Sequence, residues 1–167
     1  MPDSAKYIIG LGNYARGDDS IGLRIVETIV ERGLDRGFAA VDIGGNALNA
    51  LAYFRERTER ILFVDCALMD LAPGVCRVFA PESATSQKTL GRISTHESDL
   101  LKIVDLARRA ELFIPDIRIM AIQPESLDAG MTLSNTLADQ LDDYIRTALT
   151  EIGNGHVLSD SGSPPHH

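Results

Sequence analysis

The chain has 167 residues, of which 44% are hydrophobic and 24% are charged. This composition is that of one folded domain and excludes intrinsic disorder for most of the chain. No apolar run exceeds five residues, against the roughly 20 that a membrane-spanning helix requires, and the N-terminal MPDSAKY has no secretory-signal pattern. The net charge of −8 repels phosphate backbones, so we expect no nucleic-acid partner.

Strand-like and helix-like segments alternate along the chain, beginning with a buried strand that ends at Gly12. Short apolar runs predict further strands at residues 38–43, 61–64, 75–80 and 116–122. Apolar residues at helical spacing predict helices at residues 20–31, 47–54, 97–110 and 133–152, and the polar residues 81–91 predict a loop.

The alternation predicts a single α/β domain at residues 1–152, with a mostly parallel sheet covered by helices on both faces. Residues 153–167 are rich in Gly, Ser, Pro and His and predict a disordered C-terminal tail. The two cysteines, Cys66 and Cys76, form no CxxC motif and cannot make a disulfide framework. They favour a reducing setting, so we expect a cytoplasmic protein.

Two adjacent carboxylates, Asp18 and Asp19, follow the first strand and precede the first helix. In an open α/β sheet the ligand site lies beyond the carboxyl ends of the strands, so these side chains are candidates for a site. The alternative is that one of them is the N-cap of the helix and the other favours its dipole, and one Asp could cap while the other faces the site. The nearby Gly10 and Gly12 do not predict a dinucleotide loop, because Ala15 replaces the third glycine of the GxGxxG motif.

Two further candidates lie later in the chain. Asp65 directly follows the apolar strand 61–64, where a buried carboxylate is costly unless it is paired, hydrogen-bonded or bound to metal. The alternative is that backbone amides of the next loop satisfy it. His96 belongs to a Ser-Thr-His-Glu stretch at residues 94–97 that fits a capping box and places the imidazole in the first helical turn. There the helix dipole favours the neutral, metal-binding imidazole, although an exposed helix-end histidine is the alternative.

Asp19, Asp65 and His96 together would supply two oxygens and one nitrogen to a metal ion. Three protein ligands that leave positions open are typical of a metal site that must admit another group. Zinc, nickel and manganese all accept such ligands, so the residues alone leave the metal open. The sequence has no GxSxG motif and no cysteine with an evident histidine partner, so no nucleophile can be recognised in it.

Five segments of the sequence, taken in chain order, resemble those of the hydrogenase maturation endopeptidases. These enzymes remove the C-terminal extension from the large-subunit precursor of nickel–iron hydrogenases. The resemblance spans about residues 6–150. It is carried by IGLGN at residues 9–13, RGDDSIG at 16–22, DIGG at 42–45, FVDCA at 63–67 and STH at 94–96.

The resemblance implies a three-layer sandwich: a twisted, mostly parallel five-stranded sheet with one antiparallel strand, and helices on both faces. It also implies that Asp19, Asp65 and His96 contact nickel that the precursor already carries, so that cleavage waits for metal insertion. The same three residues are the best candidates for catalytic groups, and the isolated protein could hold another divalent metal. Gly44 and Gly45 correspond to a loop that influences precursor choice in the family, which often has Gly-Thr there.

Two other functions stay open at this point. Peptidyl-tRNA hydrolases also begin with a GLGN strand end, but they have a proline where this chain has Tyr14 and a histidine where it has Leu23. A non-catalytic, metal-sensing assembly chaperone for the same precursor would need no nucleophile. The sequence favours the endopeptidase, with Asp19 at a position where the family commonly has Glu.

Overall fold

The computed structural model describes residues 4–83 and 95–153. In chain order its elements are β1 (Lys6–Gly10), η1 (Gly17–Ser20), α1 (Ile21–Glu31), β2 (Ala39–Asp42), η2 (Ala47–Tyr53), β3 (Arg60–Cys66), β4 (Cys76–Phe79), η3 (Pro81–Ser83), α3 (Thr95–Arg109), β5 (Asp116–Ile122), α4 (Asn135–Asp139) and α5 (Leu141–Ile152), where η marks a 3-10 helix. Within these described residues, none of the helices has the length and apolarity needed to cross a membrane.

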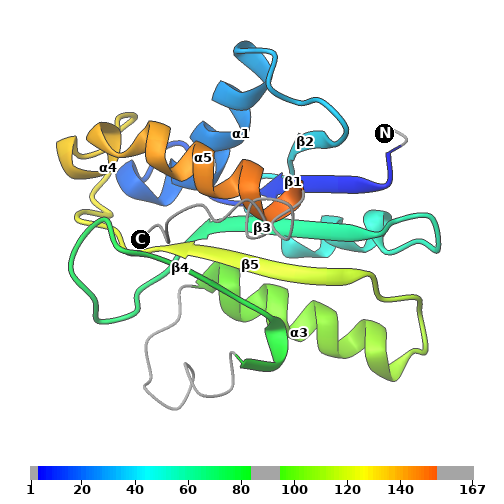
Figure 1. Cartoon of the computed structure of the whole chain (residues 1–167). Helices are drawn as coiled ribbons and strands as arrows, with labels where there is room; N and C mark the ends of the chain where they lie inside the picture. Colours follow the sequence, from blue (N-terminus) through cyan, green and yellow to red (C-terminus); the bar gives the residue numbers. More distant parts are fainter. Residues whose placement is uncertain (1–3, 84–94, 154–167) are drawn as a thin grey trace.

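The five strands form one sheet in the order β2-β1-β3-β5-β4 (Figure 1). Strands β1, β2, β3 and β5 run parallel, and β4 pairs antiparallel with β5. The register aligns Gly10 with Asp42 and with Val64, so the carboxyl ends of β1, β2 and β3 meet at one edge of the sheet. This confirms the predicted mixed α/β sheet with one antiparallel strand.

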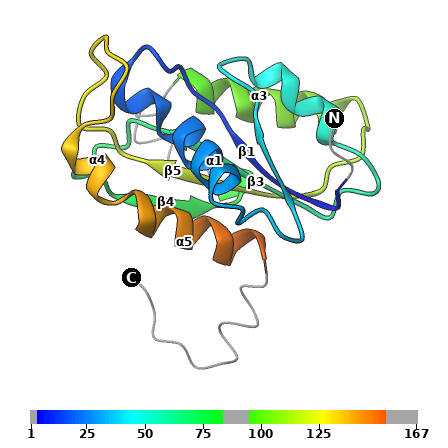
Figure 2. The same ribbon diagram turned by 90° about the horizontal axis from the view of Figure 1, so that it is seen from above.

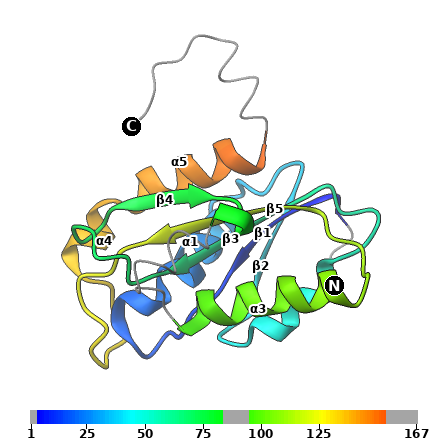
Figure 3. The same ribbon diagram turned by 90° about the horizontal axis from the view of Figure 1, so that it is seen from below.

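Helices cover both faces of the sheet, as Figure 2 and Figure 3 show from opposite sides. Alternate residues of the central strands separate the core into two layers. On one face, Ile8, Leu62 and Val64 pack with α1 and α5. On the other, Ile9 and Phe63 pack with η2 and α3. Side chains two apart on a strand share a face, so the continuous apolar run of β3 fills both layers, as the sequence predicts.

Helix α1 packs against the sheet backbone because Gly22 has no side chain. A Cβ at this position would lie 2.2 Å from the carbonyl oxygen of Val64 and 2.7 Å from that of Leu11. Both neighbours are backbone atoms, which cannot move aside cheaply. The close approach brings η1, which immediately precedes α1, to the carboxyl ends of β1 and β3.

Two predicted helices differ from the observed ones. The segment predicted as one helix at 133–152 is divided into α4 and α5 at Gln140, whose φ of −102° and ψ of 5° leave the helical path. Long-range hydrogen bonds hold the chain on either side of the division. The Ser134 hydroxyl donates to Asp18, and the Tyr144 hydroxyl donates to the carbonyl of Gly74 at 2.7 Å.

The segment at 47–54 forms the 3-10 helix η2 rather than an α-helix. The predicted loop at 81–91 starts with η3, and its remainder, like residues 154–167 of the predicted tail, lies outside the described residues.

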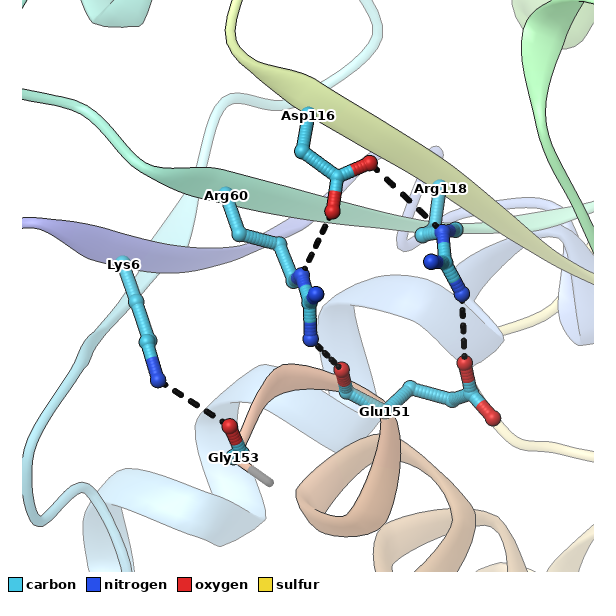
Figure 4. A network of polar contacts seen from close by, with 6 residues as sticks. All are labelled: Lys6, Arg60, Asp116, Arg118, Glu151 and Gly153. Carbon is cyan, nitrogen blue, oxygen red and sulfur yellow. Dashed lines mark hydrogen bonds and ion pairs between the residues drawn. The ribbon is translucent and has the colours of Figure 1, made fainter. Parts of the chain in front are cut away.

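A cluster of ion pairs and hydrogen bonds fastens the end of α5 to the amino ends of the strands (Figure 4). Helix α5 has no basic residue in its last turn to complement its negative end. Instead, Lys6 donates to the carbonyl of Gly153 and Arg60 to that of Glu151, each at 3.0 Å. Arg60 also pairs with Asp116 at 2.8 Å. The sheet therefore caps the helix, at the edge opposite the carboxyl ends of the parallel strands.

Candidate active site

Loops from several strands meet at the carboxyl edge of the sheet, beside α4 in Figure 1. They border an open pocket of about 440 Å³. The pocket is lined by Gly12, Asn13, Tyr14, Ala15, Leu23, Asp42, Gly44, Gly45, His96 and Met131. The lining residues come from the segments after β1 and β2, from α1, from the first turn of α3 and from the loop after β5. The structure thus has a recess where ligands bind in open α/β sheets.

Asp19 and His96 form the centre of the site. His96 Nε2 lies 2.9 Å from Asp19 Oδ2, and the two side chains are 15% and 4% exposed. The hydrogen bond with Asp19 raises the pKa of His96; burial acts in the opposite direction, and the negative charge of Asp19 raises the pKa further. The prediction that His96 lies in the first turn of its helix is confirmed, since α3 begins at Thr95. The expected preference for the neutral imidazole is wrong, because the pairing with Asp19 favours the protonated ring.

The loop after β2 supports His96 from another side. Asp42 Oδ1 accepts a hydrogen bond from the Gly44 amide at 2.7 Å, which holds the turn that carries Gly45. A Cβ added at Gly45 would lie 3.2 Å from Cε1 of His96, so the backbone of Gly45 packs directly beside the imidazole. The predicted substrate loop, Gly44 and Gly45, therefore borders both the pocket and the histidine.

Asp65 is fully buried at the carboxyl end of β3. Its Oδ1 accepts a hydrogen bond from the Cys66 amide at 2.8 Å. Because Phe63 packs toward α3, Asp65 two residues later points to the same face, which is the face that carries His96. Among the described residues, however, no three His, Cys, Asp or Glu side chains lie close enough to hold a metal ion. The structure pairs Asp19 with His96 and does not join Asp65 to them in a three-ligand cluster.

The neighbouring carboxylate, Asp18, has a different place from Asp19. The reading of one of these residues as the N-cap of α1 is wrong: the N-cap is Ser20, and it makes no side-chain capping bond. Asp18 is fully buried and bonds instead to Ser134 and to the backbone after β5. The side chains of Asp18 and Asp19 therefore point in different directions from the 3-10 helix η1.

Neither cysteine has the character of a nucleophile. Cys66 is fully buried in the core under α1 and α5, on the face opposite Asp65. Burial, followed by the negative charge of Asp65, raises the pKa of its thiol. Burial also raises the pKa of Cys76 to about 12. Both thiols are free, and burial favours their protonated form, whereas cysteine catalysis uses a thiolate.

Several residues that line the pocket were not predicted as site residues, among them Tyr14, Asp42 and Met131. The one available signal was for Met131, a large apolar residue in a polar, glycine-containing loop, and its side chain is indeed 61% exposed. Asp42 belongs to the DIGG segment that carries the family resemblance, but the spacing does not predict that Asp42 and Tyr14 line one pocket, because this depends on the pairing of β1 with β2.

Comparisons with known proteins identify the family. A sequence model of the HycI hydrogenase maturation protease family matches residues 23–151, a range that includes Asp65 and His96 and begins after Asp19. The chain is 26% identical over 154 residues to the hydrogenase expression/formation protein HoxM of Azotobacter vinelandii, and the aligned region covers 91% of this chain and 74% of HoxM. It is 25% identical over 150 residues to the hydrogenase 2 maturation protease of Escherichia coli K12, and the aligned region covers 87% of this chain and 91% of that protease.

Solved structures share the fold. The hydrogenase-maturating endopeptidase HybD from Escherichia coli superposes with a TM-score of 0.74 at 22% identity, covering 94% of this chain and 93% of HybD. The [NiFe] hydrogenase maturation protease HybD from Thermococcus kodakarensis gives a TM-score of 0.74 at 23% identity, and the superposition covers 88% of this chain and 98% of that protein. Since the family match extends over most of the chain, the protein belongs to the hydrogenase maturation proteases and is a peptide-bond hydrolase.

Proposed function

We propose that this endopeptidase removes the C-terminal extension of a nickel–iron hydrogenase large-subunit precursor after nickel has been inserted. It recognises the bound nickel through Asp19, Asp65 and His96. The observation that carries the proposal is the contact of 2.9 Å between Asp19 and His96 at the border of an open pocket. A carboxylate and an imidazole held together at the carboxyl edge of the sheet offer the oxygen and nitrogen ligands that nickel accepts.

The arrangement suits a metal that a partner presents better than one that the protein keeps. The described residues gather no complete three-ligand cluster, so a bound ion would need ligands from elsewhere. A nickel centre in the precursor brings its own ligands and leaves positions that Asp19 and His96 can fill. Asp65, buried on the same face, would be the third contact once the precursor is seated. Nickel is in this sense part of the substrate.

The pocket supplies room for the polypeptide that must be cut. Its lining combines polar groups near His96 with Tyr14, Leu23 and Met131 on other sides. A segment of the extension lying there would place its backbone next to Gly45, where the absence of a side chain lets another chain approach closely. Of the groups present, Asp19 and Asp65 are the candidates to take a proton from attacking water. The encounter with the precursor takes place in the cytoplasm under this proposal.

The test is to incubate the protein with nickel-loaded precursor and detect the released C-terminal peptide by mass spectrometry. The wild type and Asp19→Glu should release the peptide, because Glu keeps the carboxylate. Asp19→Asn and His96→Ala should not release it, provided that circular dichroism shows both to be folded. Binding of the precursor without any release by the wild type would instead identify a non-catalytic assembly chaperone. Normal release by folded His96→Ala would exclude the nickel contact.

A further inference from the structure

Asp18 makes an unusually complete set of hydrogen bonds for a side chain next to a candidate ligand. Its Oδ2 accepts from the Glu125 amide at 2.8 Å, from the Ser126 amide at 3.1 Å and from the Ser134 hydroxyl at 2.8 Å. Its Oδ1 accepts from the Ser134 amide at 2.7 Å. Three of these bonds converge on Oδ2 and one reaches Oδ1, and all four donors belong to the segment between β5 and the start of α4. Asp18 therefore fastens one part of the chain to another.

Backbone hydrogen bonds next to Asp18 join the same two loops. The Gly17 amide donates to the carbonyl of Gly130 at 2.9 Å, and the Gly130 amide donates to that of Ala15 at 2.9 Å. Arg16 and Gly130 form a short parallel bridge. The loop after β1 and the loop after β5, more than 100 residues apart in the sequence, thus form one hydrogen-bonded unit.

This unit carries two features of the site. Asp19 follows Asp18 in the single turn of η1, so the orientation of that turn decides whether the Asp19 carboxylate reaches His96. Met131 follows Gly130 directly and lines the pocket, and its carbonyl accepts a hydrogen bond from Arg24 of α1. Loosening the unit would displace a site carboxylate and a pocket wall together.

We propose that Asp18 is a positioning residue for the protease: by holding the loop after β5 against η1, it aims Asp19 at His96 and keeps Met131 at the pocket. The proposal rests on the proposed function for its effect on cleavage, but its structural part concerns the free protein. Its alternative is that Asp18 contributes only to stability, as any buried and fully bonded carboxylate does.

The experiment compares Asp18→Asn and Ser134→Ala with a destabilised control, Arg60→Ala, whose lost contacts lie at the opposite edge of the sheet. Asn at position 18 has only one acceptor oxygen, so in either orientation its NH2 group faces at least one donor that Asp18 now accepts from, and the bonds at that atom are lost. Ser134→Ala removes the hydroxyl bond to Asp18, together with the cap that this hydroxyl gives the Leu137 amide at the start of α4, and leaves the amide bonds to Asp18. The first readout is the NMR signal of the His96 imidazole in the free protein at one fixed pH. The second is the turnover of nickel-loaded precursor, measured well below each melting temperature.

We expect Asp18→Asn to shift the His96 signal and to lower kcat about 10- to 100-fold, because small displacements of a reacting group have effects of that size. Ser134→Ala should change both readouts in the same direction and by less. Arg60→Ala should change neither. Wild-type His96 signals in folded Asp18→Asn and Ser134→Ala would overturn the proposal; if Asp18→Asn does not fold, an unchanged signal in Ser134→Ala does so. Absence of cleavage by the wild type would refute the proposed function, and the NMR readout would still decide the role of Asp18.

Discussion

His96 Nε2 lies 2.9 Å from Asp19 Oδ2, which joins two residues that are 77 positions apart in the chain. The contact links the turn between β1 and α1 to the start of α3, and it is nearly closed to solvent on the Asp19 side. It makes the charge state of the histidine depend on one identifiable carboxylate.

Replacing Asp19 with Asn should lower the pKa of His96 in the metal-free protein. In the wild type, the hydrogen bond with Asp19 raises that pKa above the unfolded value of about 6.5. The pair therefore contributes stability that is fully present below about pH 6.5 and is lost as pH rises through the folded pKa. NMR titration of the imidazole, together with urea unfolding at acidic and alkaline pH, measures both effects. An unchanged pKa in folded Asp19→Asn would contradict the pairing.

Replacing Gly45 with Ala should reduce processing with little loss of stability. The added Cβ would lie 3.2 Å from Cε1 of His96, so the imidazole would have to shift and its contact with Asp19 would be disturbed. We expect kcat to fall about 10-fold. Gly44→Ala is the matched control: φ there is +64°, so Ala costs about 1 kcal/mol of backbone strain, but apart from its chain neighbours the new Cβ has no described atom within 4 Å. Equal losses of activity in the two variants would show that loop strain, and not the contact with His96, causes the effect.

Removing the Arg60 side chain should lower stability without affecting processing. The side chain caps the end of α5 through the carbonyl of Glu151 and pairs with Asp116, which also interacts with Arg118 (Figure 4). We expect Arg60→Ala to reduce the free energy of unfolding by about 1–2 kcal/mol in denaturant titrations. Arg60→Lys keeps the charge and should lose less. A fall in kcat at a temperature where Arg60→Ala is folded would mean that the two edges of the sheet are coupled.

The cysteines should be dispensable for cleavage. Because burial raises the pKa of both thiols, iodoacetamide should leave Cys66 unmodified in the native protein and modify it only after unfolding. Mass spectrometry of the native and unfolded protein counts the modified sites. The variant Cys76→Ser should process the precursor at the wild-type rate. Inactivation of native wild type in step with alkylation of Cys66 would restore cysteine as a candidate nucleophile.

Local patterns in the sequence were sufficient to predict most strands of the sheet. Strand β5 has the predicted bounds of residues 116–122, because its apolar run is flanked by clear turn signals. The division of the last helix at Gln140 was not predictable, since the row of leucines at i, i+4 spacing continues through it. Contacts from Asp18 and Gly74 lie on either side of that division, and spacing along one segment carries no information about such distant partners.

The same reasoning applies to the site. Residues at strand ends and helix starts are recognisable from the pattern, which is why Asp19 and His96 could be paired before the structure was known. The sequence placed Asp19 in the ligand set but did not predict what Asp18 does, because the segment that Asp18 bonds lies more than 100 residues away in the chain. The structure gives Asp18 four hydrogen bonds to the loop after β5 and turns Asp19 toward His96.

The most direct test of nickel recognition compares two forms of one precursor, nickel-loaded and nickel-free, with the wild-type protease. The measured quantity is the amount of C-terminal peptide released, determined by mass spectrometry over a range of protease concentrations. We predict release from the nickel-loaded precursor alone, and no release from the nickel-free form when free nickel is added to the protease. Efficient cleavage of the nickel-free precursor would contradict recognition of nickel by Asp19, Asp65 and His96.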